Sequence, residues 1–126
     1  MSVEITRDYT FFSERPIGAE LNITFDHALP ENELTTTCRD LGKLFRDQKD
    51  TILATHGRCV IYYEPVIVTV RNKTVMQYKF LPSAAVRRNG TVVIDDLDEE
   101  GGLFWSALMA DYCAVAASEY FAIDAD

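Results

Sequence analysis

The sequence lacks the cysteine spacing of a disulfide framework or a structural zinc site. Its three cysteines, Cys38, Cys59 and Cys113, are odd in number and far apart, and no Cys-x-x-Cys pair occurs. Both kinds of site need paired or closely spaced thiols. We therefore predict neither, and we expect the thiols to be small buried side chains in a reducing cytoplasm.

Long apolar runs are also missing. The N-terminal residues MSVEITRDYTFF carry charges where a signal peptide needs an apolar core. The most apolar stretch, residues 103–123, is interrupted by Asp111, Ser118 and Glu119, and such polar groups disfavour a membrane span. These features predict a soluble protein that has no membrane partner.

Lysine and arginine are absent from the last third of the chain. Residues 89–126 hold nine acids and no base, whereas residues 1–88 hold 12 bases and 11 acids, and the whole chain carries −8. The stretch from Pro65 to Ile94 has no acid and five bases, which are Arg71, Lys73, Lys79, Arg87 and Arg88. Such asymmetry influences partners and association rates rather than the fold.

No metal or cofactor motif is complete. The acidic run IDDLDEEGGLFW, residues 94–105, matches the first positions of a calcium loop, but Ala107 stands where the bidentate glutamate belongs. Its carboxylates also repel a phosphate from the glycine pair that follows. We predict no cofactor and no metal. The acids start a helix, and their excess indicates solvent or a cationic partner; they are Asp95, Asp96, Asp98, Glu99 and Glu100.

Catalytic and nucleic-acid-binding signatures are absent as well. His27 and His56 fall at expected element boundaries, and no spacing links them to a cysteine nucleophile. The chain charge of −8 opposes nucleic-acid binding that is driven by counterion release. We therefore predict no catalytic residue, and we do not expect a nucleic-acid partner. An enzyme with an unrecognised pocket stays open as an alternative, since scattered residues can assemble a pocket.

Hydrophobic periodicity predicts one α+β domain over residues 1–126. Two alternating runs, 3–11 and 19–25, form a hairpin, and a helix extends to about residue 55. Further strands follow to Ile94 with a turn at Asn89-Gly90, and a second helix spans 99–121. The predicted order is ββ-α-ββββ-α, an antiparallel sheet of about five to six strands covered by two helices.

One loop length follows from the pattern of faces. A three-residue loop at 71–73 places Val66, Val68 and Val70 on the same face as the apolar side chains of residues 74–80. A two-residue loop places the valines with Gln77 and Lys79 instead. Because a slip of one residue exposes the whole set, we predict the three-residue loop.

The second helix is apolar around most of its circumference. Its apolar surface is wider than packing on one sheet requires, so either the domain buries the helix or a second chain covers the remainder. The residues of the predicted interface are Trp105, Ala107, Met109, Ala110, Ala114, Ala117 and Tyr120.

These features predict a non-enzymatic interaction or assembly protein that forms homo-oligomers. In the expected contact, the basic hairpins of one subunit meet the acidic run of the next in a head-to-tail arrangement. An acidic inhibitor of nucleic-acid-mimic type, as in phage counter-defence, is the alternative, and its target is a cationic groove. The predicted partner is protein in either case.

Overall fold

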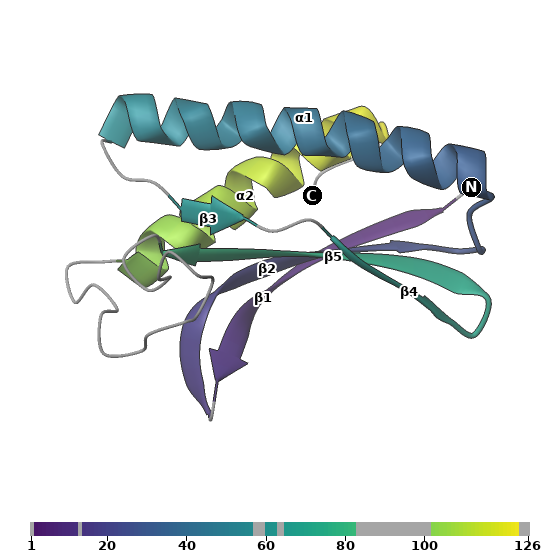
Figure 1. Ribbon diagram of the computed structural model, residues 1–126, viewed down its shortest axis with the longest axis horizontal. Coiled ribbons are helices and arrows are strands. Elements are labelled where there is room, and N and C mark those ends of the chain that lie inside the picture. The colour runs from purple at the N-terminus through teal and green to yellow at the C-terminus, as the bar shows by residue number, and fades with distance from the viewer. Residues whose placement is uncertain (1, 13, 57–59, 63–64, 83–101, 124–126) are drawn as a thin grey trace.

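The computed structural model describes residues 2–12, 14–56, 60–62, 65–82 and 102–123 (Figure 1). Within these ranges the element order is ββ-α-βββ-α. The strands and helices are β1 (Val3–Phe12), β2 (Arg15–Phe25), α1 (Glu31–His56), β3 (Val60–Tyr62), β4 (Val66–Val70), β5 (Lys73–Pro82) and α2 (Gly102–Tyr120).

All strand pairs are antiparallel, and the sheet order is β1-β2-β5-β3, with β4 also pairing with β5. β3 pairs with β5 at residues 80–82 and β4 pairs with it at residues 73–77, while β2 occupies the other side of β5. β3 and β4 therefore lie end to end along one edge of the sheet. β1 forms the opposite edge.

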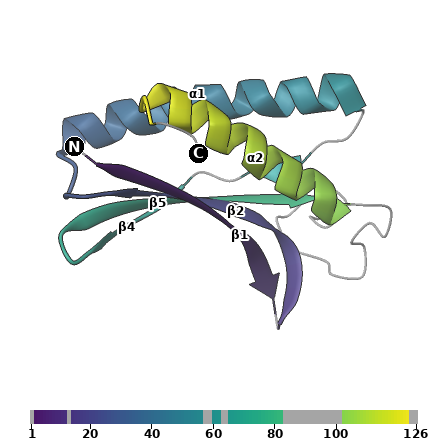
Figure 2. The same cartoon turned by 180° about the vertical axis from the view of Figure 1, so that it is seen from behind.

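Both helices lie on one face of the sheet, as Figures 1 and 2 show from opposite sides. We call the opposite face, on which neither helix lies, the outer face. The strand alternation decides which side chains meet the helices. Leu21, Ile23 and Phe25 of β2 and Met76, Tyr78 and Phe80 of β5 point toward the helices and are buried.

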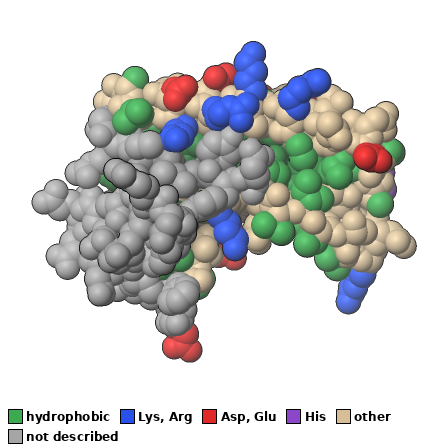
Figure 3. All heavy atoms as spheres, in the orientation of Figure 1, with side chains coloured by type: hydrophobic (Ala, Val, Ile, Leu, Met, Phe, Trp, Pro, Cys, Tyr) green, Lys and Arg blue, Asp and Glu red, His purple; other side chains and the backbone are tan. Residues whose placement is uncertain are grey.

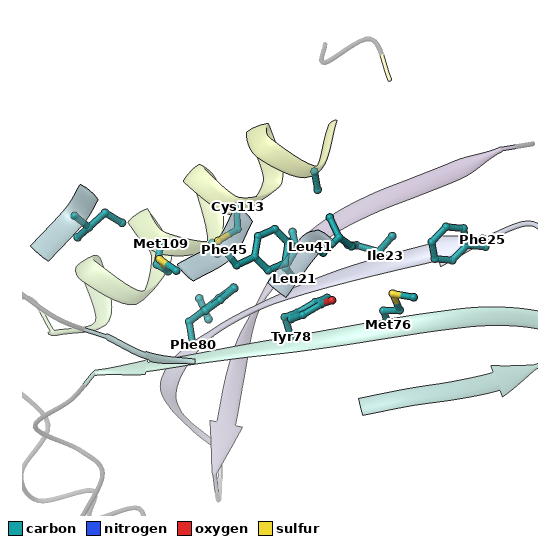
Figure 4. Close-up of a cluster of buried hydrophobic side chains, with 14 residues drawn as sticks. Leu21, Ile23, Phe25, Leu41, Phe45, Met76, Tyr78, Phe80, Met109 and Cys113 are labelled. Atoms are coloured by element: carbon teal, nitrogen blue, oxygen red, sulfur yellow. The ribbon is translucent and has the colours of Figure 1, made fainter. Parts of the chain in front are cut away.

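The core sits between this face and the two helices (Figure 4). Phe45 of α1 lies edge-on to Tyr78 and Phe80, with ring centroids 4.7 and 6.4 Å apart. Met109 and Cys113 of α2 complete the same cluster. Edge-to-face rings add about 0.5–1.5 kcal/mol to the energy of apolar burial, so Phe45 is a principal link between α1 and the sheet.

The α+β class, the antiparallel sheet and the two covering helices are confirmed. The three-residue loop is wrong. Val70 pairs directly with Lys73, so the loop has two residues, Arg71 and Asn72. The described strands between the helices are three rather than four, and the predicted hairpin at Asn89-Gly90 lies outside the described residues.

Candidate protein-interaction surface

β4 is exposed along its whole length. Every one of its five residues is exposed, and the fractions for the large side chains are 52% at Val66, 38% at Ile67, 44% at Val68 and 52% at Val70. Among the described residues, β5 is the only strand that pairs with β4. Within the part of the chain that the structure describes, no strand lies beside the outer backbone edge of β4, and we call residues 66–70 the β4 edge.

The local sequence explains why this strand forms. All five residues are β-branched, and such side chains favour extended backbone. The turn that follows has φ of 52° at Arg71 and 63° at Asn72. Two successive residues with positive φ are typical of a type I′ turn, whose twist matches that of an antiparallel hairpin. The turn thus sets the register of β4 on β5.

This register places the valines on the outer face. Val66, Val68 and Val70 lie opposite Gln77, Val75 and Lys73, whose side chains point away from the helices. From the alternation of these three valines we expected them to be buried. They are instead exposed, because the turn geometry rather than hydrophobic burial sets the register.

β5 holds β4 in place through a firm connection to the rest of the chain. The amide of Thr74 donates to the carbonyl of His27 at 3.1 Å, and the Thr74 hydroxyl accepts from the amide of Leu29 at 2.9 Å. Gln77 Nε2 donates to Asn22 Oδ1 across the outer face at 3.2 Å. β4 therefore pairs with a strand that is itself hydrogen-bonded to residues 22, 27 and 29.

β1, at the other edge of the sheet, has features that oppose the addition of a further strand. β1 carries Glu4, Arg7 and Asp8, and Arg7 forms an ion pair with Asp111 of α2. A β-bulge between Thr10 and Phe11 also interrupts its pairing with β2. Charged side chains and bulges are the usual devices by which natural sheets prevent strand addition. β4 has no charged side chain, and its pairing with β5 is regular.

The predicted cationic residues divide into two groups in the structure. Arg71 and Lys73 are exposed at the end of the β4–β5 hairpin. Lys79 is half-buried on the outer face opposite Glu20, which in turn lies opposite Asp8. Figure 3 shows hydrophobic side chains over the part of the surface where β4 lies, with a basic side chain at the hairpin end. Arg87, Arg88 and the acidic run 95–100 lie outside the described residues.

Glu20 has an unusual environment for a surface carboxyl. Partial burial, supported by the charge of Asp8, raises its pKa, while Lys79 and a hydrogen bond with Asn22 act in the opposite direction. Lys79 therefore balances carboxylates of its own chain. Of the described basic residues, Arg71 and Lys73 are the two available at the β4 edge.

The residues of the predicted helix interface are mostly used within the chain. Met109, Ala110 and Ala117 are buried against the sheet and α1, and Trp105, Ala107 and Ala114 are half-buried. Tyr120 remains 39% exposed, and its hydroxyl donates to Asp40 of α1 at 2.8 Å. We therefore place the buried members of this set in the core of the domain.

Two apolar side chains of α2 are exposed that sequence reasoning did not single out. Phe104 is 60% exposed and Val115 is 56% exposed. They are separate residues on a helix whose small-residue face is buried, whereas the exposed residues of β4 are consecutive. The signal that pointed to the β4 edge was present in the sequence as five β-branched residues before a short turn.

The described residues line two hollows that are open to solvent. One, of about 650 Å³, lies where the N-terminal part of α1 meets the end of α2 and is lined by residues that include Phe25, His27, Thr37 and Tyr120. The other, of about 580 Å³, lies between β1 and α2 beside the Arg7–Asp111 pair.

His27 is the histidine at the larger hollow, and its Nδ1 lies 2.7 Å from Asp26 Oδ1. This contact, together with a hydrogen bond from the Ser2 amide, lowers the pKa of Asp26. Both groups are partly exposed at the end of β2. In the described ranges no three histidine, cysteine or carboxylate side chains gather as metal ligands.

Neither helix within the described ranges is long and apolar enough to span a membrane. Compared with models of protein families, with curated proteins and with solved structures, the chain shows no match.

Proposed function

We propose that this chain is a non-enzymatic interaction or assembly protein that associates with copies of itself through the β4 edge. One observation supports this proposal above the others. A sheet that has a charged and bulged strand at one edge ends at the other in five exposed β-branched residues. An exposed apolar edge strand is a template for strand addition.

Two physical contributions favour association there. An added strand satisfies the outward N–H and C=O groups of β4, and it buries apolar side chains that water now contacts. Apolar burial contributes about 25 cal/mol per Å². Because β4 is already ordered on β5, the protein loses little backbone freedom when a second strand binds.

Charge favours approach to an anionic partner. The stretch from Pro65 to Ile94 contributes +5 to a chain total of −8, so the rest of the chain carries −13. Arg71 and Lys73 stand at the end of the β4–β5 hairpin, where they meet an approaching chain early. Complementary charges of this kind chiefly raise the association rate.

The test is the native mass of the protein, measured by light scattering over a concentration series for the wild type and for Val68→Lys. We expect the wild type to exceed the 14.3 kDa of one chain and Val68→Lys to remain at one chain, because a charge in the middle of the edge opposes pairing. Val115→Lys is the matched control, since Val115 is also an exposed valine and lies on α2. It should associate as the wild type does.

The salt dependence of association distinguishes self-association through the β4 edge from a head-to-tail contact. Association through the apolar β4 edge should persist in about 0.5 M NaCl, where the screening length is roughly 4–5 Å, because the burial of apolar side chains does not depend on charge. A head-to-tail contact with the acidic run 95–100 should weaken instead. A wild type that stays at one chain throughout the series contradicts the proposal, and so does a Val68→Lys variant that associates normally.

A further inference from the structure

We propose that two copies pair β4 against β4 in antiparallel orientation around a two-fold axis at Val68, which yields a closed dimer with one continuous sheet. This inference rests on the proposed function and gives it a stoichiometry and a register. A two-fold contact uses the same surface of both copies and closes on itself. It therefore differs from the head-to-tail contact, which extends into a ring or a filament.

The length of β4 selects the register. With the axis at Val68, Val66 faces Val70 of the second copy and Ile67 faces its Thr69, so all five residues of the strand are paired. An axis at Ile67 brings Pro65 into the pairing, and Pro65 has no N–H to donate. An axis at Thr69 brings in Arg71, whose positive φ belongs to the turn.

The same register aligns the faces of the two sheets. Residues that lie directly opposite each other in an antiparallel pair point to the same side. The outward valines of one copy therefore join those of the other in a single apolar stripe, which consists of Val66, Val68 and Val70 of both copies. The helices of both copies come to lie on the other side of the combined sheet, where they leave the stripe uncovered.

Charge favours a second copy in antiparallel orientation. Arg71 is three residues from the axis, so the two Arg71 residues stand roughly 20 Å apart, which exceeds the screening length of about 8 Å at physiological salt. Parallel pairing would set the two basic turns side by side. In the antiparallel dimer each basic turn instead extends along the other copy, whose residues outside 65–94 carry −13.

Cysteine cross-linking tests this register directly. In the dimer the two copies of residue 68 face each other at a Cα separation of about 4.5–5.5 Å, which a disulfide can bridge. We expect Val68→Cys to shift under mild oxidation from 14.3 kDa to twice that mass on non-reducing electrophoresis. The wild type carries the same native cysteines and shows how much cross-linking they contribute.

Val75→Cys is the matched control. Val75 is a valine of the outer face that lies directly opposite Val68 on β5. Its two copies would stand three strand spacings apart in the dimer, roughly 14 Å, which is too far for a disulfide. We expect this variant to cross-link no more than the wild type does.

A mixture of Val66→Cys and Val70→Cys chains provides the second test if Val68→Cys does not fold. The register predicts a disulfide in the mixture and none in either variant alone, because only position 66 faces position 70. Thermal melting checks the fold of each variant.

The outcomes separate the two proposals. If the wild type associates and Val68→Lys does not, but neither cysteine test gives the expected pair, the β4 edge stands as the interface and the two-fold register is overturned. Equal cross-linking at residues 68 and 75 overturns the register too. If the wild type is a single chain at every concentration, both proposals fall.

Discussion

At the scale of single residues, the outer face of the sheet carries a row of three charged side chains on neighbouring strands. Asp8, Glu20 and Lys79 lie opposite one another on three adjacent strands. Partial burial disfavours the charged form of Glu20, the charge of Asp8 adds to this effect, and the charge of Lys79 acts against it. Lys79 therefore has carboxylates of its own chain as neighbours in the sheet.

The raised pKa of Glu20 has a definite consequence for stability. A carboxyl whose pKa is higher in the folded than in the unfolded chain favours folding when protonated, and this contribution is lost as the pH rises through the folded pKa. We predict that Glu20→Gln raises the melting temperature at pH 7. The difference should disappear below about pH 4, where the wild-type carboxyl is also neutral.

Glu4→Gln is the control for this prediction, because Glu4 is an exposed glutamate on β1. Calorimetric melting of the wild type and both variants between about pH 3 and 7 checks this prediction. The range spans the ordinary glutamate pKa of about 4.3. A Glu20→Gln variant that melts below the wild type at pH 7 would mean that the attraction of the Lys79 charge outweighs the cost of burial.

At the scale of elements, the β4–β5 hairpin is set by its turn. Arg71 and Asn72 both have positive φ, although neither is glycine, and asparagine tolerates this conformation better than most residues do. A left-handed L-residue costs roughly 1–2 kcal/mol. The turn is therefore strained. The pairing of β4 with β5 and the hydrogen bonds of β5 to residues 27 and 29 offset this cost.

Substitutions at Asn72 measure this strain. We predict that Asn72→Gly stabilises the protein or leaves it unchanged, whereas Asn72→Val destabilises it by about 1–2 kcal/mol, because a β-branched residue resists positive φ. Urea unfolding followed by circular dichroism gives both values. Equal stability of the two variants would contradict the two-residue turn and would favour the three-residue loop that the sequence pattern suggested.

The sequence predicted elements well where one face is buried. Alternation identified β2 and β5 with their inward side chains, since a strand between two neighbours and a helix layer has one apolar face. It misjudged β4, because the same reasoning required Val66, Val68 and Val70 to be buried and an edge strand has no such requirement. For α2 the sequence revealed the amount of apolar surface, but tertiary packing decided what covers it.

At the scale of the whole molecule, the proposed function rests on asymmetry. Among the described residues, both helices lie on one face of the sheet (Figures 1 and 2). The β1 edge is bulged, whereas the side chains of β4 are exposed. The charge is likewise divided between a basic stretch and an anionic remainder. In the proposed dimer, a second copy at the β4 edge would cover the exposed apolar strand, and each basic turn would lie toward an anionic chain.

The most direct test of the β4 edge as the interface is amide hydrogen exchange, measured residue by residue at low and high protein concentration. In an antiparallel pair alternate N–H groups point away from the partner strand, and a second copy protects those of β4. We predict that exchange within Val66–Val70 slows as the concentration rises, whereas exchange within Val3–Phe12 does not change. Exchange at β4 that is independent of concentration, or slowing confined to β1 or α2, would contradict the account.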